Sequence, residues 1–317
     1  MTETGSGKTA FSIGSAGEGF FMTVDSCDLN IGFIGAGKVG TALGSALDRH
    51  GYKVTAVSSR NYSGALRMAS SLSGCKAFQT PQETADASDL IFITTPDFAI
   101  SQVCENIQWK RGKMVVHTSG ADSRSVLNAA SQAGALTGVF HPLATIIKKN
   151  VTQNPFRCIT VTLEAEPPLF GTLERLARSL GANTIQLQEE NRAIYHASAV
   201  FVSNYIATLA DIATTLWQEM GFSKQEAEKA LLPLLKGAVD NLETAGLPDC
   251  LTGPVSRGDT GTLRKHLDAL DKLDGSVAAI YRKLGHRTVD IALKKGSINP
   301  RQAVQLNSIF NTGEENE

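Results

Sequence analysis

The sequence contains few of the residues that build disulfide frameworks or metal centres. Its five cysteines stand at positions 27, 75, 104, 158 and 250, and no two of them form a C-x-x-C pair. Its six histidines are equally scattered, without the H-E-x-x-H spacing of a zinc-binding helix. We therefore expect no disulfide framework, no metal site and a reducing, cytoplasmic location.

An excess of charge of either sign is also missing. Thirty Lys and Arg residues stand against 31 Asp and Glu residues, which leaves a formal net charge of −1. Aromatic residues make up only 6% of the chain, so stacking surfaces for single-stranded nucleic acid are not expected. This composition argues against a nucleic-acid partner and against a polybasic membrane-binding surface.

No long hydrophobic run is free of polar residues. The most apolar stretch, 193–217, contains His196, Ser203, Asn204 and Asp211. We therefore predict a buried core helix here rather than a membrane span, and we expect no membrane partner.

The chain has instead an ordinary globular composition, with 42% hydrophobic and 19% charged residues. Its 317 residues suit two domains of about 150 residues each. Residues 1–28 are rich in Gly, Ser and Thr without any period, which predicts a flexible leader. Residues 29–189 mix strand and helix patterns, whereas residues 190–317 show helix patterns alone, so we predict one domain for each range.

A glycine motif follows the first predicted strand. The apolar run 29–34 leads into the pattern G-x-G-x-x-G, and a helix pattern comes directly after it. In such a unit the first glycine permits a tight turn, the second lets a pyrophosphate approach the backbone, and the third lets the helix pack on the strand. Free N–H groups at the helix start favour an anion. The alternative is a glycine-rich turn without a ligand. The predicted cofactor-binding residues are Gly35, Ala36, Gly37, Lys38, Val39 and Gly40.

The end of the second predicted strand indicates which dinucleotide is bound. NAD sites usually carry an acidic residue there, which holds the ribose hydroxyls. This sequence has no acidic residue between Asp48 and Glu83, and Ser58, Ser59 and Arg60 occupy the strand end. Hydroxyl and guanidinium groups suit a 2′-phosphate. We predict NADP(H) as the cofactor, and the alternative is that Arg60 is only a solvated surface charge.

Strand and helix patterns alternate in the first domain as a parallel sheet requires. Three predicted strands end in polar or glycine-containing loops, at 94–97, 117–121 and 141–142. The ligand crevice of an open α/β sheet lies at these carboxyl ends, although any one loop is equally compatible with a plain turn. We predict a doubly wound, mostly parallel α/β sheet of the Rossmann type, followed by an all-α domain. The loop residues expected at the cofactor or substrate are Thr95, Pro96, Ser119, Gly120 and His141.

The helical part begins with one long predicted helix that extends to Met220. Ser223 and Glu226 form a capping box that starts the next helix. Two or three further helices extend to about Lys295, interrupted by the loop 247–259.

Six motifs occur along the chain in one order: G-F-I-G-A-G-K-V-G, T-P-D, H-T-S-G-A, H-P-L, Y-H-A-S-A-V-F-V-S-N-Y and L-T-G-P-V-S-R-G-D. Together they resemble the Rossmann-like NADP oxidoreductases whose helical C-terminal domain has no assigned function, over residues 29–290. The layout is also similar to pyrroline-5-carboxylate reductases and deazaflavin-dependent NADP oxidoreductases. The resemblance implies an NADP oxidoreductase that forms a homodimer through its helical domains. Ketopantoate reductase activity in some relatives implies a small keto acid as substrate.

Hydride transfer needs a proton donor and groups that orient the substrate. At 100° per residue, His196, Ser203 and Asn204 lie on one broad face of the long helix, and we predict that they are catalytic. The alternative is a set of internal hydrogen bonds, with His196 as a core histidine. The more distantly similar β-hydroxyacid dehydrogenases place a lysine four residues before such an asparagine, and here that residue is Val200. Their lysine-based acid catalysis is therefore not expected.

The loop before a helix that begins near Gly261 completes the predicted site. In the reductases that the chain resembles, the matching loop holds the substrate carboxylate with backbone N–H groups and hydroxyls. We therefore expect Thr252, Gly253 and Arg257 to bind a small anionic substrate, with an Arg257–Asp259 salt bridge as the alternative.

The function predicted from these observations is NADPH-dependent reduction of a small, carboxylate-bearing ketone or imine, with ketopantoate as an example. One alternative is a dehydrogenase of the prephenate or arogenate type, whose H-P motif is loosely similar to His141-Pro142. The other is a dimeric sensor that binds NADP(H) without turnover.

Overall fold

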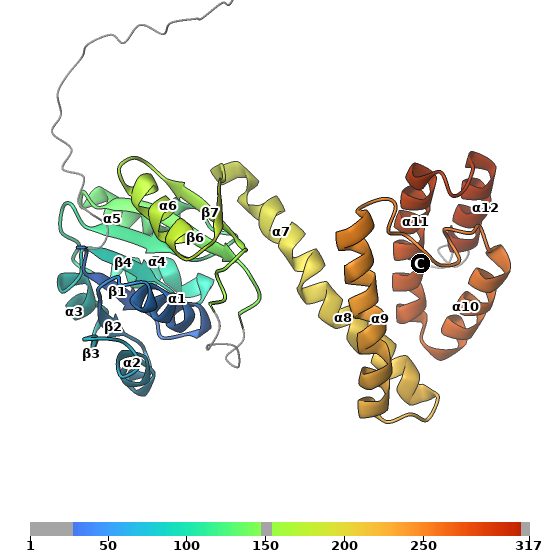
Figure 1. Ribbon diagram of the computed structural model, residues 1–317, viewed down its shortest axis with the longest axis horizontal. Helices are drawn as coiled ribbons and strands as arrows, with labels where there is room; N and C mark the ends of the chain where they lie inside the picture. The colour runs from blue at the N-terminus through green and yellow to red at the C-terminus, as the bar shows by residue number, and fades with distance from the viewer. Residues whose placement is uncertain (1–27, 147–153, 312–317) are drawn as a thin grey trace, which may run out of the picture. The chain divides into compact units, whose positions relative to one another are not determined.

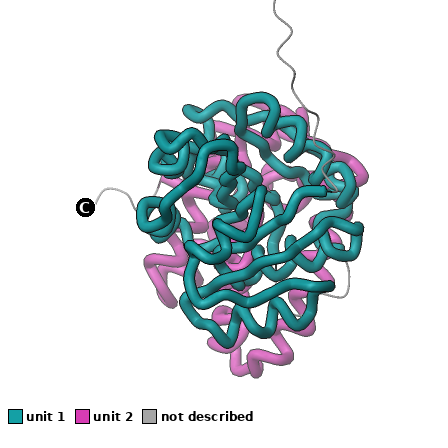
Figure 2. Tube along the Cα trace, turned by 90° about the vertical axis from the view of Figure 1, so that its left-hand side faces the viewer, with its two compact units in different colours: residues 1–200 teal, residues 201–317 magenta. Residues whose placement is uncertain are grey.

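The computed structural model describes residues 28–146 and 154–311, and the chain divides into two units, 1–200 and 201–317 (Figures 1 and 2). The division follows Val200, inside helix α7 (Arg192–Val202), whereas the sequence pattern places the boundary before residue 190. The predicted leader lies outside the described residues except for Asp28.

The first unit is built on an eight-stranded sheet of order β3-β2-β1-β4-β5-β6-β7-β8. All neighbouring strands are parallel except β6 and β7, which are antiparallel. The order reverses between β1 and β4, which is the topological switch point where an open sheet has its ligand crevice. The strands are β1 (Ile31–Ile34), β2 (Val54–Ser58), β3 (Lys76–Phe78), β4 (Leu90–Ile93), β5 (Met114–His117), β6 (Leu136–Leu143), β7 (Thr160–Ala165) and β8 (Asn183–Gln186).

Helices cover both faces of the sheet, so the predicted doubly wound fold is confirmed (Figure 1). Successive side chains of a strand point to opposite faces, and Phe92 accordingly joins one core while Ile91 and Ile93 join the other. The first core includes side chains of α1 (Lys38–Arg49), α2 (Tyr62–Ala69) and α6 (Leu169–Ser179). The second includes those of α3 (Pro81–Asp86), α4 (Ile100–Glu105) and α5 (Asn128–Gln132).

The second unit is all helical, as predicted. Its helices are α8 (Asn204–Glu219), α9 (Lys224–Ala245), α10 (Thr260–Leu273), α11 (Gly275–Lys295) and α12 (Pro300–Asn311). The predicted capping box is present, because Ser223 accepts from the Glu226 N–H and the Glu226 carboxylate accepts from the Ser223 N–H. Helix α12 was not predicted, although its Leu306, Ile309 and Phe310 form part of the core shared with α10 and α11.

The predicted long helix differs from the structure in two respects. It is broken at Ser203, whose backbone (φ −126°, ψ −72°) leaves the helical region and starts α8. It is also not a buried core helix. The stretch Glu189–Glu219 is long and apolar enough to cross a membrane by length and composition, with a mean hydropathy of 1.3, yet only 6% of its most apolar window is buried. The prediction of burial was wrong because the chain folds other helices against only part of this apolar surface.

Candidate functional site

The glycine turn after β1 is held by hydrogen bonds from two neighbouring strands. Gly35 has φ +116°, a conformation that side-chain-bearing residues rarely adopt. Its N–H donates to Ser58 O at the end of β2 (2.8 Å), and its carbonyl accepts from Thr94 Oγ1 at the end of β4 (2.7 Å). The turn is therefore fixed by residues on both sides of the switch point.

The other two glycines of the motif have different surroundings. A Cβ on Gly40 would lie 2.4 Å from both Gly35 O and Thr94 Oγ1, so only glycine lets α1 approach the turn this closely. A Cβ on Gly37 would meet only Thr94 O, at 3.8 Å. The protein itself therefore leaves open the space in front of Gly37.

That open space faces the start of α1, which suits a phosphate group. Gly37 is the N-cap of α1 and provides no side-chain cap, and the first turn contains no acidic residue. The N–H groups of a first helical turn have no partner inside the helix, and the helix dipole favours an anion there. Lys38 is exposed, and Ala36 and Val39 are half-buried beside it. These residues fit the pyrophosphate of a dinucleotide.

The end of β2 forms the neighbouring part of the site. Arg60 is exposed and Ser59 is half-buried, whereas Ser58 is fully buried and its hydroxyl has no partner among the described residues. A Cβ on Gly64 would lie 3.8 Å from Ala36 Cβ, from Ser59 Oγ and from Arg67 Nη2. Ser59 and a second arginine thus lie close to the glycine turn, while Ser58 has no exposed surface to offer a 2′-phosphate.

Arg67 is a candidate that the sequence analysis missed. It lies on α2, where its Nη1 donates to Ser63 Oγ (3.1 Å). Asn61 caps this helix by accepting from the Ser63 N–H, so α2 begins at Tyr62, two residues after Arg60. The i,i+4 spacing of Ser63 and Arg67 could have indicated that these two side chains meet on one face of the helix.

The remaining predicted cofactor residues lie in the loops after β4 and β5, and they differ in burial and in hydrogen bonding. Thr95 Oγ1 is buried without a partner among the described residues, and Pro96 is exposed. Ser119 is buried and already occupied, since its N–H donates to His117 Nδ1 (3.1 Å) and its Oγ donates to Asp122 Oδ2 (3.0 Å). A direct cofactor contact is therefore harder to provide from Ser119 than from its neighbour Gly120.

Gly120 packs against two imidazole rings. A Cβ there would lie 2.5 Å from His196 Nδ1 and 2.8 Å from His141 Nε2. His141 Nδ1 is hydrogen-bonded to Tyr195 Oη (2.8 Å), and the centroids of the two imidazoles are 6.1 Å apart. His196 Nδ1 is buried without a partner among the described residues. The fold thus brings together the loop after β5, the end of β6 and helix α7.

A buried ion pair lies beneath this cluster. Arg192 at the start of α7 is 1% exposed, and its Nε donates to Glu164 Oε2 on β7. Glu164 also accepts from the Arg124 N–H through Oε1 (3.2 Å). Neither Nη group of Arg192 has a partner among the described residues. This ion pair between Arg192 and Glu164, 28 positions apart in the sequence, connects α7 to the sheet.

His117 is a buried neutral histidine, and its tautomer follows from its partners. Nδ1 accepts from the Ser119 N–H, so Nε2 carries the proton and donates to Ser123 O (2.9 Å). Burial lowers the His117 pKa from 6.5 to about 4, and the nearby Arg192 adds to this effect.

This pKa predicts a loss of stability in acid. Between pH 6.5 and about 4 the unfolded chain binds a proton at His117 and the folded chain does not, so stability falls as the pH is lowered through that window. The loss amounts to about 3 kcal/mol at full extent. Urea unfolding at pH 7, 6 and 5 should show a smaller decrease for His117→Gln than for the wild type. Equal slopes in His117→Gln and in the wild type would contradict the assignment.

His196, Ser203 and Asn204 do not lie on one face of a single continuous helix. Ser203 is the N-cap of α8, and its Oγ donates to Asn204 Oδ1 (2.9 Å). The break at Ser203 ends the regular 100° progression on which the shared face with His196 was predicted, so that prediction was wrong. His196 belongs to the first unit, whereas Ser203 and Asn204 belong to the second.

The loop before α10 is built from turns and a helix cap. Thr252 and Arg257 are exposed, and Gly253 has φ +94°. Asp259 caps α10 by accepting from the Thr262 N–H (3.0 Å), and this hydrogen bond lowers the Asp259 pKa more than the charge of Arg257 does. Among the described residues Arg257 and Asp259 form no ion pair, so the alternative interpretation of this loop was wrong.

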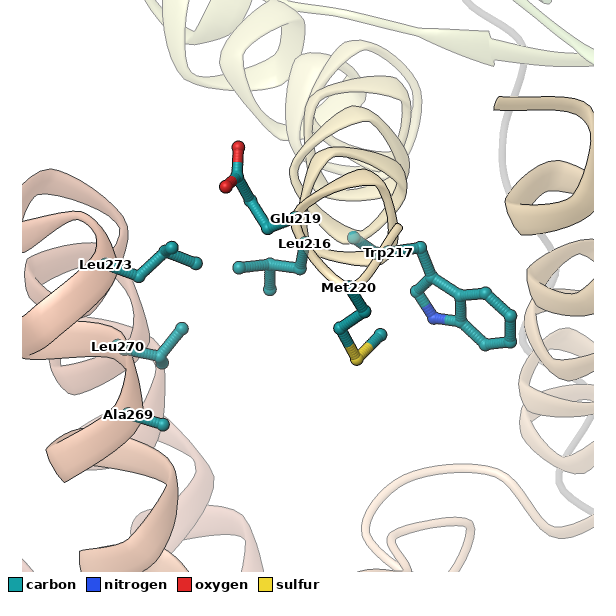
Figure 3. A pocket seen from close by; sticks show the side chains of 8 residues that line it. Leu216, Trp217, Glu219, Met220, Ala269, Leu270 and Leu273 are labelled. Atoms are coloured by element: carbon teal, nitrogen blue, oxygen red, sulfur yellow. The ribbon is translucent and has the colours of Figure 1, made fainter. Parts of the chain in front are cut away.

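Two of the cavities inside the helical unit are lined mainly by apolar side chains. One of about 500 Å³ is lined by Leu216 and Trp217 of α8, by Met220 directly after α8, and by Leu270 and Leu273 of α10 (Figure 3). None of the predicted site residues lines it. Across residues 28–146 and 154–311 no group of three or more His, Cys, Asp or Glu side chains is placed to hold a metal ion.

Two family profiles match the chain in succession. A Rossmann-like domain matches residues 17–142, and a domain of unknown function, DUF2520, matches residues 159–288. The chain joins a Rossmann-like domain to a DUF2520 domain. The glycine turn, Thr94 and the His141 end of β6 therefore lie in the Rossmann-like match, and Arg192, Tyr195 and His196 lie in the DUF2520 match. The imidazole cluster is made from both. No curated protein matches the sequence.

Solved structures share this fold at low sequence identity. A Bacteroides fragilis protein provisionally named an NADP oxidoreductase has 23% identity and a TM-score of 0.69, over 84% of this chain and 100% of its own. A Thermotoga maritima protein has 22% identity and a TM-score of 0.66, over 84% and 99%. A pyrroline-5-carboxylate reductase from Streptococcus pyogenes has 17% identity and a TM-score of 0.57, over 88% and 98%.

Proposed function

We propose that this protein is an NADPH-dependent oxidoreductase that reduces a small, carboxylate-bearing ketone or imine. The observation that carries the proposal is the open space in front of Gly37 at the uncapped start of α1. Its neighbours support the choice of dinucleotide, because Ser59 and Arg60 follow β2 and Arg67 of α2 lies near Ser59, which together supply two cations and a hydroxyl. The solved relatives include a pyrroline-5-carboxylate reductase and a reductive aminase in complex with NADPH.

Each part of the proposed site has a task in binding. The first turn of α1 holds the pyrophosphate through N–H groups, and Arg60 with Arg67 holds the 2′-phosphate. When bound, the reduced nicotinamide supplies a hydride to the carbonyl or imine carbon. Gly120 and the imidazoles of His141 and His196 line the carboxyl edge of the sheet, where an open α/β sheet places its ligand. We further propose that Asn204, Ser203 and the loop residues Thr252, Gly253 and Arg257 orient the substrate carboxylate and carbonyl.

The function is tested by binding and turnover measured separately. NADPH binding is followed by nicotinamide fluorescence, and turnover by loss of NADPH absorbance with a panel of 2-keto acids, ketopantoate and cyclic imines. We expect tight NADPH binding and turnover of at least one carboxylate-bearing compound. Tight NADPH binding without turnover of any compound would contradict the proposed enzymatic activity and favour a sensor. Oxidation of prephenate would favour the prephenate-type alternative.

Cofactor choice predicts a selective effect of Arg60→Asp. Loss of a guanidinium–phosphate contact and gain of a repelling carboxylate should weaken NADPH binding by about 10- to 100-fold. NADH binding should change by less than about twofold, since NADH has no 2′-phosphate. Arg111→Asp is the matched control, because this exposed arginine precedes β5 and so lies at the opposite, amino-terminal edge of the sheet. Equal weakening of NADPH and NADH by Arg60→Asp would contradict the assignment.

We also propose that the helical unit forms a homodimer. Leu209 of α8 and Leu232 of α9 are 40% and 51% exposed, and both line an apolar groove between these helices. Single soluble chains rarely expose contiguous apolar surface of this kind, and closed two-fold dimers are the commonest assembly. The balanced net charge of −1 offers no electrostatic preference for a different, highly charged partner.

Leu209→Glu is expected to convert the dimer into a monomer, because it places a charge in the proposed dimer contact. Light scattering coupled to size exclusion measures the molar mass directly. Leu66→Glu on α2, which is 47% exposed and lies in the first unit, should leave the dimer intact. A wild-type mass of 33.7 kDa at micromolar concentration would contradict the dimer.

A further inference from the structure

A histidine and a tyrosine form a hydrogen-bonded pair at the carboxyl edge of the sheet. His141 Nδ1 and Tyr195 Oη are 2.8 Å apart, and their rings meet edge to face with centroids 5.6 Å apart. The pair joins β6 to α7 across 54 positions of sequence. Both side chains are half-buried, so each is fixed by packing and still has an accessible surface.

The strand register places the pair at the predicted ligand crevice. Strand β5 ends where His117 pairs with Val139, and β6 continues beyond this point through His141 to Leu143. Gly120, in the loop after β5, then packs against His141 Nε2. The turn at Gly35 lies at the same carboxyl edge, across β4 from this loop. An open α/β sheet binds ligands outside this edge.

Both members of the pair are neutral at physiological pH. Burial lowers the His141 pKa to about 4, and His196, Arg192 and His117 add to this effect. Burial also raises the Tyr195 pKa, against the smaller opposing effects of a Thr162 hydrogen bond and the charge of Arg192. The nearby carboxylates are already occupied, because Glu164 pairs with Arg192, Glu189 accepts from Ser123 Oγ, and Asp122 accepts from Ser119 Oγ.

We propose that Tyr195 is the proton donor of the reduction and that His141 holds its hydroxyl in place and restores its proton. This inference rests on the proposed function and adds a catalytic residue to it. Tyr195 Oη has a partner that aligns it, whereas His196 Nδ1 is buried without a partner among the described residues. With His141 Nδ1–H and the Thr162 hydroxyl both donating to Tyr195 Oη, the phenol proton is left to point toward a substrate.

The proton and electron balance is complete with the hydride of the bound cofactor. The hydride forms a C–H bond as the π bond of the carbonyl or imine breaks, and the Tyr195 O–H bond breaks as an O–H or N–H bond forms on the substrate. The resulting tyrosinate is stabilised by the His141 Nδ1–H and by the charge of Arg192. It then takes the Nδ1 proton while His141 Nε2 takes a proton from water. Solvent then removes the Nε2 proton and returns one to Nδ1, which restores the starting tautomer. The net reaction consumes one hydride and one solvent proton.

Tyr195→Phe tests the donor directly. It removes only the hydroxyl, and we expect kcat to fall by about 100-fold or more while the NADPH dissociation constant stays within about twofold. The helical unit contains a matched control, since His266 Nδ1 and Tyr281 Oη are also 2.8 Å apart. Tyr281→Phe should keep wild-type kcat. Unchanged kcat in Tyr195→Phe would overturn the proposal and leave the proposed function standing, whereas absence of turnover by the wild type would overturn both.

His141 is tested as a positioning residue by two substitutions and one spectrum. His141→Asn keeps an N–H donor near Nδ1 and should retain more kcat than His141→Leu. In ¹⁵N NMR of the NADPH-bound wild type, we expect His141 to carry its proton on Nδ1 and the Nδ1 resonance to shift in Tyr195→Phe. A proton on Nε2 alone, with Nδ1 accepting from the phenol, would overturn the proposal regardless of the activity.

Discussion

Gly37→Ala should abolish tight NADPH binding without unfolding the protein. The added Cβ meets only Thr94 O at 3.8 Å, which is ordinary van der Waals contact, so the fold accommodates it. The same methyl group occupies the space that a pyrophosphate needs for close approach to the backbone. We expect NADPH affinity to fall by about 100-fold, or roughly 3 kcal/mol, with a change in melting temperature below about 2 °C.

Gly40→Ala is the matched comparison, because the same methyl group at this position should disturb the fold rather than the phosphate site. Its Cβ would lie 2.4 Å from Gly35 O and Thr94 Oγ1, so the helix must move and stability should fall by about 1–3 kcal/mol or more. Fluorescence titration with NADPH and thermal unfolding, run on both variants, separate the two roles. Tight NADPH binding by Gly37→Ala would contradict the proposed phosphate position.

Glu164→Gln should have the largest effect on stability. Arg192 is 1% exposed, and Glu164 is its ion-pair partner in the described structure. Removing one charge of a buried pair leaves the other uncompensated, which costs about 3–5 kcal/mol. Urea unfolding measures this loss. The pair of Glu174 and Arg178, whose side chains are 33% and 67% exposed, is the control, and Glu174→Gln should cost less than about 1 kcal/mol.

The double variant Glu164→Leu/Arg192→Met tests whether the two side chains stabilise the protein as an ion pair or contribute to its free energy of unfolding independently. Apolar side chains of similar size often replace a buried pair at little cost. The double variant should therefore be more stable than Glu164→Gln alone, and the four-variant cycle should give a coupling free energy well above that of distant sites. Additive losses would contradict a direct interaction between the two residues.

Local sequence patterns were sufficient for most of the first unit. The apolar runs predicted the parallel strands, and the position of the glycine motif between a strand and a helix predicted the turn at the switch point. The direction of β7 was not predictable, because an apolar strand pattern is the same for parallel and antiparallel pairing. Helix α3 was not predicted, because its six residues are too few to show a helical period. The capping box formed by Thr80 and Glu83 marks the start of this helix in the sequence.

The candidate site was harder to predict because its contacts are distant in the sequence. Tyr195 and His141 are 54 positions apart, and no spacing rule connects a strand end to a later helix. Arg192 and Glu164 appear in the sequence as ordinary charged residues, yet both are buried. At Ser203 the helical period continues through the sequence while the backbone leaves the helix, so the predicted shared face was lost.

The hydroxyl of Thr94 gives the glycine turn a support from outside the strand–turn–helix segment that carries the motif. Thr94 lies 59 positions after Gly35 and directly follows β4, which flanks β1 on the side opposite β2. The motif is therefore not a portable module. A segment comprising only residues 29–60, transferred to another protein, would contain all three glycines and still lack the group that closes the turn.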